Sequence, residues 1–396
     1  MSDWLADLPT YDLHASEASL NELYASARSA GGLGNVGGYF AAFRHDQVKA
    51  LLAHRSVVPR IVDPSVELSP YVRSRLDEHM LNRNGADHVR LRRLVSREFT
   101  PGAVARHEAR VLHVIDELIA LIDADKPCDF MAVFANRLPI MVICDILGMP
   151  RDEGEGLLDA VDRSGRFFDR LRAQEHMPEV ESGYRDLEAY FDAFFSRPID
   201  DMPDGLLRNL RSIEMEGDRL THQELMMWAQ LLFRGGLGNT RHQIGSLIHL
   251  LARSPDQWSR IREEPALARR AVEECMRVEP AVHSILRQVR EEFEFEGWRL
   301  AVGTGIMCVT ASANRDEHAY PRAAEFDVTR DPAPGHLLFG GGPHLCPGNL
   351  LVKSEVALAL QRLTSAFSAV ELAGEPVFKP ALQVNGPDSL PVVFRA

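Results

Sequence analysis

Apolar residues recur at three- and four-residue intervals along much of the middle of the chain. They do so over about residues 104–123 and 130–147, with Pro101 before the first segment and Gly148 after the second. This period is typical of amphipathic helices, and proline and glycine commonly mark where helices begin and end. The pattern therefore predicts two helices in this part of the chain.

The same periodicity predicts a long helix over about residues 221–253 and a further one over about 256–279. The first of these begins with Thr221 and Glu224, a threonine and a glutamate in the spacing of a capping box. Such a pair satisfies free backbone N–H groups at a helix N-terminus, so we expect this helix to begin at Thr221.

Alternation typical of strands occurs only in short pieces, over 288–300 and 302–310, and the C-terminal residues 366–396 predict a small β meander. No internal repeat or linker-like stretch divides the chain. We therefore expect a mainly α fold with small β-sheets, formed as a single large domain over residues 1–396, with a helix-rich body at about 86–280.

The chain is acidic, with 44 basic against 57 acidic residues and a net charge of −13. This charge argues against nucleic acid or an anionic membrane as a partner. Its apolar stretches are shorter than the ~20 residues that span a bilayer, and its beginning lacks a signal-peptide pattern. Five scattered cysteines fit a reducing compartment, so we expect a soluble cytoplasmic protein.

One cysteine, Cys346, lies on a glycine-rich loop over residues 339–348, just before an apolar, helix-like segment. We expect Cys346 at the N-cap of that helix and Pro347 at its first position. The N–H groups of Gly348 and Asn349 and the helix dipole would then favour a thiolate that is ready to bind a metal.

The other residues of this loop suit a flat ligand. Three consecutive glycines at 340–342 let such a ligand approach the backbone, Phe339 can pack against it, and His344 can reach an acidic group on its edge. The loop therefore predicts a haem iron with an axial thiolate. The alternatives are a buried cysteine in a turn and a zinc site, and the absence of any CxxC pair argues against zinc.

The spacing F-G-x-G-x-H-x-C-x-G over residues 339–348 resembles the cysteine loop of cytochromes P450, the haem-thiolate monooxygenases. The resemblance runs from about residue 86 to the end. It implies the cytochrome P450 fold, heme b with Cys346 as the iron ligand, O₂ as a substrate, and a separate ferredoxin or flavodoxin type electron donor with its reductase. The haem contacts that it implies are His88, Arg92, Gly235, Arg287, Phe339, His344, Cys346 and Gly348.

In the family, a glutamate and an arginine three residues apart form a buried ion network with a later arginine, and this network braces the cysteine loop. Glu274 and Arg277 match the pair, and we assign Arg330 as the third member. Many relatives have an arginine just before the phenylalanine of the later segment, where this chain has Glu325.

His88 and Arg92 are four residues apart and share one face of a predicted helix, as two donors to one carboxylate require. The resemblance assigns them, with Arg287 and His344, to the haem propionates; the alternative for the helix is a solvated basic face. Further cations at Arg93, Arg97 and Lys353 would face the thiolate side, where an acidic redox partner could dock.

The segment over residues 231–241 resembles the distal, oxygen-side helix of the family. Its three glycines would each cost about 1 kcal/mol in a helix interior, which close approach to a haem would explain. Relatives usually have an acid followed by threonine here. This chain has Gly238 at the place of the acid and Asn239 at that of the threonine, while Thr240 lies one position late, about 100° around the helix.

Arg234 lies one turn before Gly238, and we expect it to bind a carboxylate or carbonyl of the substrate; the alternative is an internal salt bridge. His283 would add a second polar contact in the pocket. The stretches 56–86 and 160–200 would form the remaining walls, and they contain Arg60, Phe167 and Phe168.

Together these features predict a monooxygenase that oxidises a small polar or carboxylate-bearing or carbonyl-bearing substrate, such as a natural-product intermediate. The replacement of the acid–threonine pair by Gly238 and Asn239 leaves a second hypothesis open, oxidative C–C or C–N coupling or peroxide-driven chemistry. A third hypothesis is a haem-binding sensor or carrier.

Overall fold

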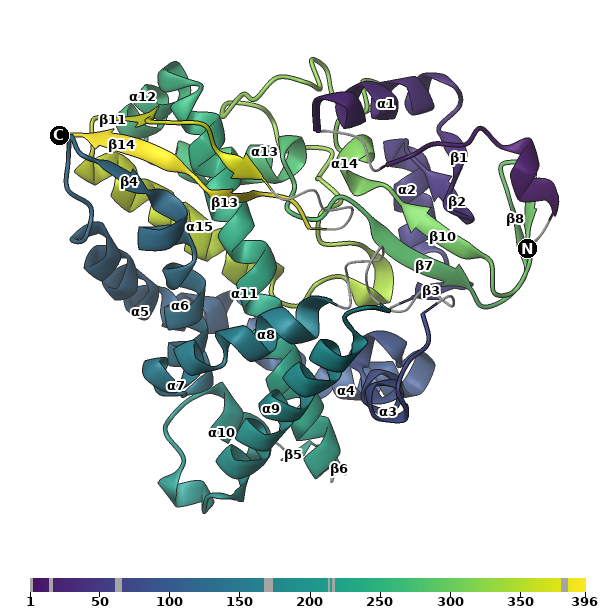
Figure 1. Cartoon of the computed structure of the whole chain (residues 1–396), viewed down its shortest axis with the longest axis horizontal. Coiled ribbons are helices and arrows are strands. Elements are labelled where there is room, and N and C mark those ends of the chain that lie inside the picture. Colours follow the sequence, from purple (N-terminus) through teal and green to yellow (C-terminus); the bar gives the residue numbers. More distant parts are fainter. Residues whose placement is uncertain are drawn as a thin grey trace.

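The computed structural model describes residues 3–13, 17–60, 66–166, 174–212, 214–215, 218–378 and 384–396. Helices form most of it, and small sheets lie at two sides (Figure 1). This confirms the predicted mainly α fold with small β-sheets. In the part of the chain that the structure describes, no helix has the length and apolar character needed to cross a membrane.

The helices that form the body run through the middle of the chain. Those before the long central helix are α1 Glu17–Ser29, α2 His45–Ala53, α3 Pro70–Glu78, α4 Gly85–Ser96, α5 Pro101–Ile119, α6 Arg137–Leu147, α7 Arg151–Gly156, α8 Leu158–Gly165, α9 Met177–Ser196 and α10 Leu206–Ser212. The central helix and those after it are α11 His222–Ala252, α12 Pro255–Glu263, α13 Leu267–Val278, α14 Thr310–Ala313 and α15 Asn349–Ala366.

The predicted helix boundaries hold where capping residues specify them. Thr221 and Glu224 form the expected capping box at the start of α11, and Pro101 is the first residue of α5. Gly148 ends α6 in the left-handed conformation, with φ of +79°, which glycine adopts without steric cost. Local chemistry therefore sets these boundaries.

Two of the predicted helices are interrupted. The segment 256–279 forms α12 and α13 with a break at Pro265, because proline has no N–H to continue the first helix. The segment 130–147 begins with a five-residue π-helical turn, Met131–Ala135, before α6. The apolar period continues through both breaks, so periodicity alone did not reveal them.

The larger sheet has five strands in the order β1-β2-β10-β7-β3 and packs against α2 and α14 (Figure 1). Its strands are β1 Leu33–Val36, β2 Tyr39–Ala42, β3 Val57–Pro59, β7 Ile285–Val289 and β10 Gly305–Cys308. The hairpin β8 Phe293–Phe295 and β9 Trp298–Leu300 extends from it. The stretch 288–300 is thus the end of one strand and a hairpin, not one strand.

The C-terminal strands do not form the simple meander that the sequence predicted. β14 Pro391–Arg395 pairs with both β11 Ala369–Leu372 and the distant β4 Pro127–Asp129. β12 Val377–Phe378 pairs separately with β13 Pro387–Ser389, and β5 Glu214–Met215 with β6 Asp218–Arg219. A partner strand so far away in the sequence leaves no local signal, so this prediction was wrong in its topology.

Helix α11 crosses the middle of the molecule and touches α6, α9, α13 and α15 (Figure 1). Its fully buried Trp228 and Phe233 belong to the main core, and the Phe233 ring lies 6.0 Å from that of Phe191 in α9. This packing fixes the helix along its length. The candidate site is built between α11 and the loop that precedes α15.

Helices α8 and α9 approach each other at Gly183. A methyl group on this residue would lie 2.6 Å from the carbonyl oxygen of Ala160 and 2.6 Å from the amide nitrogen of Ser164. Because these are backbone atoms, they can give way only if the whole helix moves. The close packing of α8 on α9 therefore requires glycine here.

We expect Gly183→Ala to lower the free energy of unfolding by about 1–3 kcal/mol, since overpacking against backbone outweighs the better helix propensity of alanine. Equilibrium chemical unfolding measures this. A matched control is Gly156→Ala at the end of α7, where an added methyl meets no described atom within 4 Å. Equal stability of the two variants would contradict the prediction.

Candidate active site

The cysteine loop lies between a short 3₁₀ turn, Gly342–His344, and α15. Cys346 precedes the helix by three residues, and Gly348 is the N-cap, so the prediction that Cys346 is the N-cap and Pro347 the first helical residue was wrong. The reason is a tight turn in which the side-chain amide of Asn349 donates to the carbonyl oxygen of Cys346 at 2.6 Å.

The predicted donors do reach the sulfur of Cys346. The N–H groups of Gly348 and Asn349 bond to it, and the charge of Arg92 also favours its thiolate. Burial outweighs them and raises the pKa of the Cys346 thiol above its ordinary value. The helix end alone thus does not produce the expected thiolate. A bound metal would supply the missing stabilisation, because a coordinating thiol is deprotonated.

Two glycines fix the path of the loop. Gly340 and Gly342 have φ of +76° and +64°, in the left-handed region. A methyl on Gly342 would also lie 2.9 Å from the carbonyl oxygen of Leu52, at the end of α2. The amide of Cys346 donates to the carbonyl oxygen of Phe339 at 3.0 Å and closes the loop on itself.

Four basic side chains gather beside this loop. His88 and Arg92 come from α4, Arg287 from β7 and His344 from the loop itself. The rings of His88 and His344 lie 4.2 Å apart, and Arg92 donates to the carbonyl oxygen of Leu345 at 2.6 Å. These four predicted residues therefore converge from three separate parts of the chain.

No described carboxylate compensates this cluster. Burial and the neighbours His88, Arg287 and Arg92 lower the pKa of His344 to about 3. Burial likewise lowers the pKa of Arg287, which is only 7% exposed, and that of His88. The Nε2 atom of His88 is buried and has no hydrogen-bond partner among the described residues. Such a cluster suits an anionic group with several acceptors, which the two propionates of haem would supply.

The face of α11 opposite the loop is also shaped for a ligand. A methyl on Gly235 or Gly238 would meet no described atom within 4 Å, whereas one on Gly236 would touch Ile143 at 3.3 Å. Asn239 is exposed on the open face, and Thr240 is buried and 1% exposed. The cysteine loop, the basic cluster and this bare helix face together fit a haem.

The helix itself remains continuous for 31 residues through its glycines. Because successive residues of a helix are about 100° apart, Asn239 and Thr240 cannot face the same space. The side chain next to the open face is thus that of Asn239. Thr240, which is 1% exposed, lies on the packed side of the helix.

Arg234 lies at the meeting point of α11, α8 and α9. Its guanidinium carbon is 4.6 Å from the centroid of the Tyr184 ring, and it donates to the carbonyl oxygen of Ser164 at 3.4 Å. Among the described residues no carboxylate forms an ion pair with it. Burial and the charge of Arg234 lower the pKa of His79 to about 3. The stretches 56–86 and 160–200 therefore both contribute residues next to Arg234.

His283 and Arg60, two other predicted pocket residues, lie in the described part of the chain. His283 is 8% exposed, its Nδ1 lacks a described partner, and burial and Arg315 lower its pKa to about 4. Arg60 lies over the ring of Tyr39 in the larger sheet. Phe167 and Phe168 fall outside the described residues.

The predicted ion network around Glu274 is present as geometry. Arg277 makes two hydrogen bonds of 2.8 Å to the two oxygens of Glu274, and Arg330 makes a third of 2.8 Å. Arg277 also donates to the carbonyl oxygens of Asn314, Ala323 and Glu325. Glu325 thus takes part in this network through its backbone carbonyl and not through its side chain. The network ties α13 to the segment that leads into the cysteine loop.

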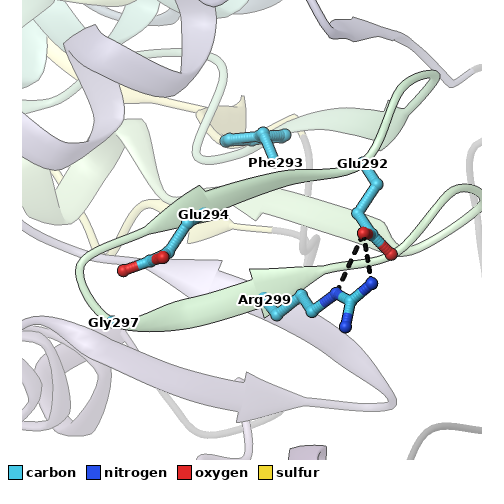
Figure 2. Close-up of a pocket in the computed structure, with 5 residues that line it drawn as sticks. All are labelled: Glu292, Phe293, Glu294, Gly297 and Arg299. Carbon is cyan, nitrogen blue, oxygen red and sulfur yellow. Dashed lines mark hydrogen bonds and ion pairs between the residues drawn. The ribbon is translucent and has the colours of Figure 1, made fainter.

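A separate hollow of about 340 Å³ lies on the hairpin β8–β9 (Figure 2). Glu292, Phe293, Glu294, Gly297 and Arg299 line it, and Arg299 donates twice to Glu292. The hairpin projects at the edge of the molecule, away from α11 (Figure 1). None of the predicted site residues lies in this hollow.

Comparison with known proteins identifies the family and its fold. The family model for cytochrome P450 matches residues 39–383, and the chain therefore belongs to the cytochrome P450 family, whose members bind haem. It is similar to the steroid C26-monooxygenase of Mycobacterium tuberculosis (strain CDC 1551 / Oshkosh), with 31% identity over 80% of this chain and 85% of the relative.

Two further similarities place the chain among bacterial enzymes of this family. The vitamin D(3) 25-hydroxylase of Pseudonocardia autotrophica is 32% identical over 78% of this chain and 76% of the relative. The crystal structure of P450BioI, solved with an acyl carrier protein that carries hexadec-9Z-enoic acid, superimposes with a TM-score of 0.89 over 100% of both chains, at 25% identity. The chain is accordingly a haem-dependent oxidoreductase of the monooxygenase class.

Sequence reasoning missed several residues next to the site. Tyr184 and His79 beside Arg234 lie on segments with no motif, and only the three-dimensional structure brings them together. His336, three residues before Phe339, and Glu273, next to Glu274, were also overlooked. Their closeness to the two motifs was the one available signal.

We expect Cys346→Ala to abolish thiolate ligation, because it removes the sulfur around which the loop is closed. The Soret band of the ferrous CO complex, measured on protein purified with haem supplied, tests this. Cys128→Ala, a half-buried cysteine outside the loop, is the matched control and should keep the thiolate spectrum. An unaltered spectrum in the Cys346 variant would refute the assignment of the ligand.

Proposed function

We propose that this cytochrome P450 oxidises a small organic acid, or a similar polar substrate such as a natural-product intermediate, that Arg234 binds through a carboxylate or carbonyl group. O₂ is the second substrate. Haem with an axial thiolate supplies the O–O cleavage chemistry. The role of the chain is to hold the substrate between α11 and the helices α8 and α9.

The observation that carries this proposal is the charge of Arg234, which forms an ion pair with no carboxylate among the described residues. A half-buried guanidinium without a carboxylate partner is costly, and stacking on Tyr184 and one weak hydrogen bond to Ser164 compensate only part of that cost. A substrate carboxylate would complete the pairing. His79, which remains neutral because its pKa is about 3, adds no competing charge of its own.

Electrons would come from a separate ferredoxin or flavodoxin type protein with its reductase. Arg93 and Arg97, on the side of the cysteine loop, are exposed and suit an acidic partner. Lys353, the third cation considered for this surface, is paired with Glu273 at 2.7 Å. Arg93 and Arg97 are candidates for docking because both side chains are exposed.

For Arg234→Gln we expect the binding of carboxylic acids to weaken by about 1.5–3 kcal/mol, since a charge-assisted hydrogen bond is lost. The measurement is the substrate-induced shift of haem from low to high spin, titrated with a panel of fatty and aryl-alkanoic acids and with their methyl esters. The esters should bind the wild type and the variant with similar affinity.

The matched control is Arg241→Gln. Arg241 lies two turns along the same helix and pairs with Asp162 at 3.6 Å. This variant should retain the preference for acids over esters. If Arg234→Gln retains that preference too, Arg234 is excluded as the group that binds the acid, while the haem assignment is unaffected.

A second candidate function follows from Asn239. Asparagine donates and accepts hydrogen bonds but does not relay protons as a carboxylic acid does, and Gly238 offers no acid at the neighbouring position. Oxidative C–C or C–N coupling or a peroxide-driven reaction would depend less on such a relay. Products formed under ¹⁸O₂ separate the two functions, because coupling incorporates no label.

We expect Asn239→Thr to change the fraction of reducing equivalents lost as hydrogen peroxide, because this side chain lies on the open face of α11. Peroxide yield per NAD(P)H consumed, with a reconstituted electron donor, measures the effect. Thr240→Val is the control on the buried side and should leave the yield unchanged. An unchanged yield in the Asn239 variant would remove this residue from oxygen handling.

A further inference from the structure

Three side chains from three segments meet around Phe339, the residue that begins the cysteine loop. Glu273 comes from α13, His336 from the segment before the loop, and Lys353 from α15. One oxygen of the Glu273 carboxylate lies 2.7 Å from Lys353 Nζ, and the other lies 3.3 Å from His336 Nε2. A single carboxylate thus joins the two helices to the loop.

The tautomer of His336 is determined by the backbone. The N–H of Leu338 donates to His336 Nδ1 at 3.2 Å, which leaves the ring proton on Nε2, facing Glu273. Burial disfavours the charge of Glu273, but the hydrogen bonds from His336 and Lys353 outweigh it and lower its pKa to about 2. Burial also lowers the pKa of His336. At neutral pH Glu273 is therefore a carboxylate and His336 a neutral imidazole.

The same two partners of Glu273 both contact the ring of Phe339. Lys353 Nζ lies 5.4 Å from the ring centroid, within the range of a cation–π interaction, and the ring of His336 lies 5.5 Å away. The carbonyl oxygen of Phe339 accepts the hydrogen bond from the amide of Cys346 at 3.0 Å. One aromatic residue consequently connects the Glu273 cluster to the metal-binding cysteine.

This cluster is distinct from the ion network of Glu274. The two glutamates are neighbours on α13 and point about 100° apart. Glu274 pairs with Arg277 and Arg330, whereas Glu273 pairs with Lys353 and His336. The first network holds the segment that precedes the loop, and the second contacts the loop itself.

We propose that Glu273, His336 and Lys353 form a positioning network that fixes the Phe339 ring and, through it, the sulfur of Cys346 in its iron-ligating position. The network acts through Phe339 and touches neither substrate nor iron. Its loss would loosen thiolate ligation while leaving substrate recognition intact.

If these three residues only stabilised the fold, their removal would change the spectrum of the haem only in proportion to the loss of stability. The side chains of Lys353 and Glu273 are each 28% exposed, and ion pairs near the surface typically contribute only about 0–1 kcal/mol to stability. Removing Lys353 should therefore alter the unfolding midpoint little. A spectroscopic change at the haem without a matching loss of stability would distinguish positioning from simple stabilisation.

The test uses the full-length, haem-loaded protein with the substitutions Glu273→Gln and Lys353→Met. For each variant we expect the ferrous CO complex to convert from the thiolate-type to the neutral-thiol-type spectrum several-fold faster than in the wild type. The reduction potential should shift as well. The affinity for the ligand that gives the largest spin shift should stay within a factor of two.

Two further variants complete the design. Lys353→Arg keeps both the ion pair and the contact with Phe339, so it should restore a conversion rate close to that of the wild type. Arg362→Gln removes another ion pair of α15, with Asp116 at 3.3 Å, that lies away from the loop. Its conversion rate should equal that of the wild type.

Wild-type conversion rates in both Glu273→Gln and Lys353→Met would overturn the proposal. Equal acceleration in Arg362→Gln, or acceleration that follows the loss of thermal stability in every variant, would overturn it too, by assigning these residues a structural role. If Glu273→Gln does not fold, Lys353→Met decides the question, because its side chain lies partly in solvent.

Discussion

The buried pairing of Arg277 with Glu274 is the interaction on which the rest of this structure depends. Both side chains are less than 5% exposed, and all hydrogen-bonding partners of Arg277 lie within the fold. Because the guanidinium binds three backbone carbonyls as well as the carboxylate, it fixes a stretch of irregular chain that has no secondary structure of its own. The cysteine loop follows this stretch directly. A buried pair of this kind gains little free energy over a well-packed apolar core, so its value lies in the conformation that it selects.

That conformation produces a site with an unbalanced charge. His88, Arg92, Arg287 and His344 gather near Cys346 without a described carboxylate, while the opposite face of α11 is bare at Gly235 and Gly238. An anionic, flat cofactor resolves both features at once, since its acidic edge meets the cations and its plane fits against the glycines. Arg234 is a second positive group, stacked on Tyr184, that no carboxylate among the described residues neutralises. The basic cluster and Arg234 therefore select ligands by charge, and the bare glycines of α11 select them by shape.

The sequence could predict those parts of the molecule in which local chemistry decides the outcome. The capping box at Thr221 and the helix end at Gly148 each act over a few residues and were predicted correctly, and the motif around Cys346 predicted the family correctly. The break between α12 and α13 was missed because the apolar period continues through Pro265. The start of α15 was placed two residues too early, because the side chain of Asn349 closes a turn that periodicity does not reveal. The pairing of β14 with β4, and the approach of His79 and Tyr184 to Arg234, depend on contacts between distant segments, for which one sequence carries no signal.

The contact at Gly183 has a consequence for how a molecule enters the pocket. Because α8 and α9 touch through backbone atoms at this residue, we expect the two helices to move together as one unit. Arg234 touches both of them, through Ser164 and through Tyr184. If this unit moved away from α11, the guanidinium of Arg234 would lose its contacts with Ser164 and Tyr184 and become exposed to solutes. Its return would enclose a solute bound to that charge.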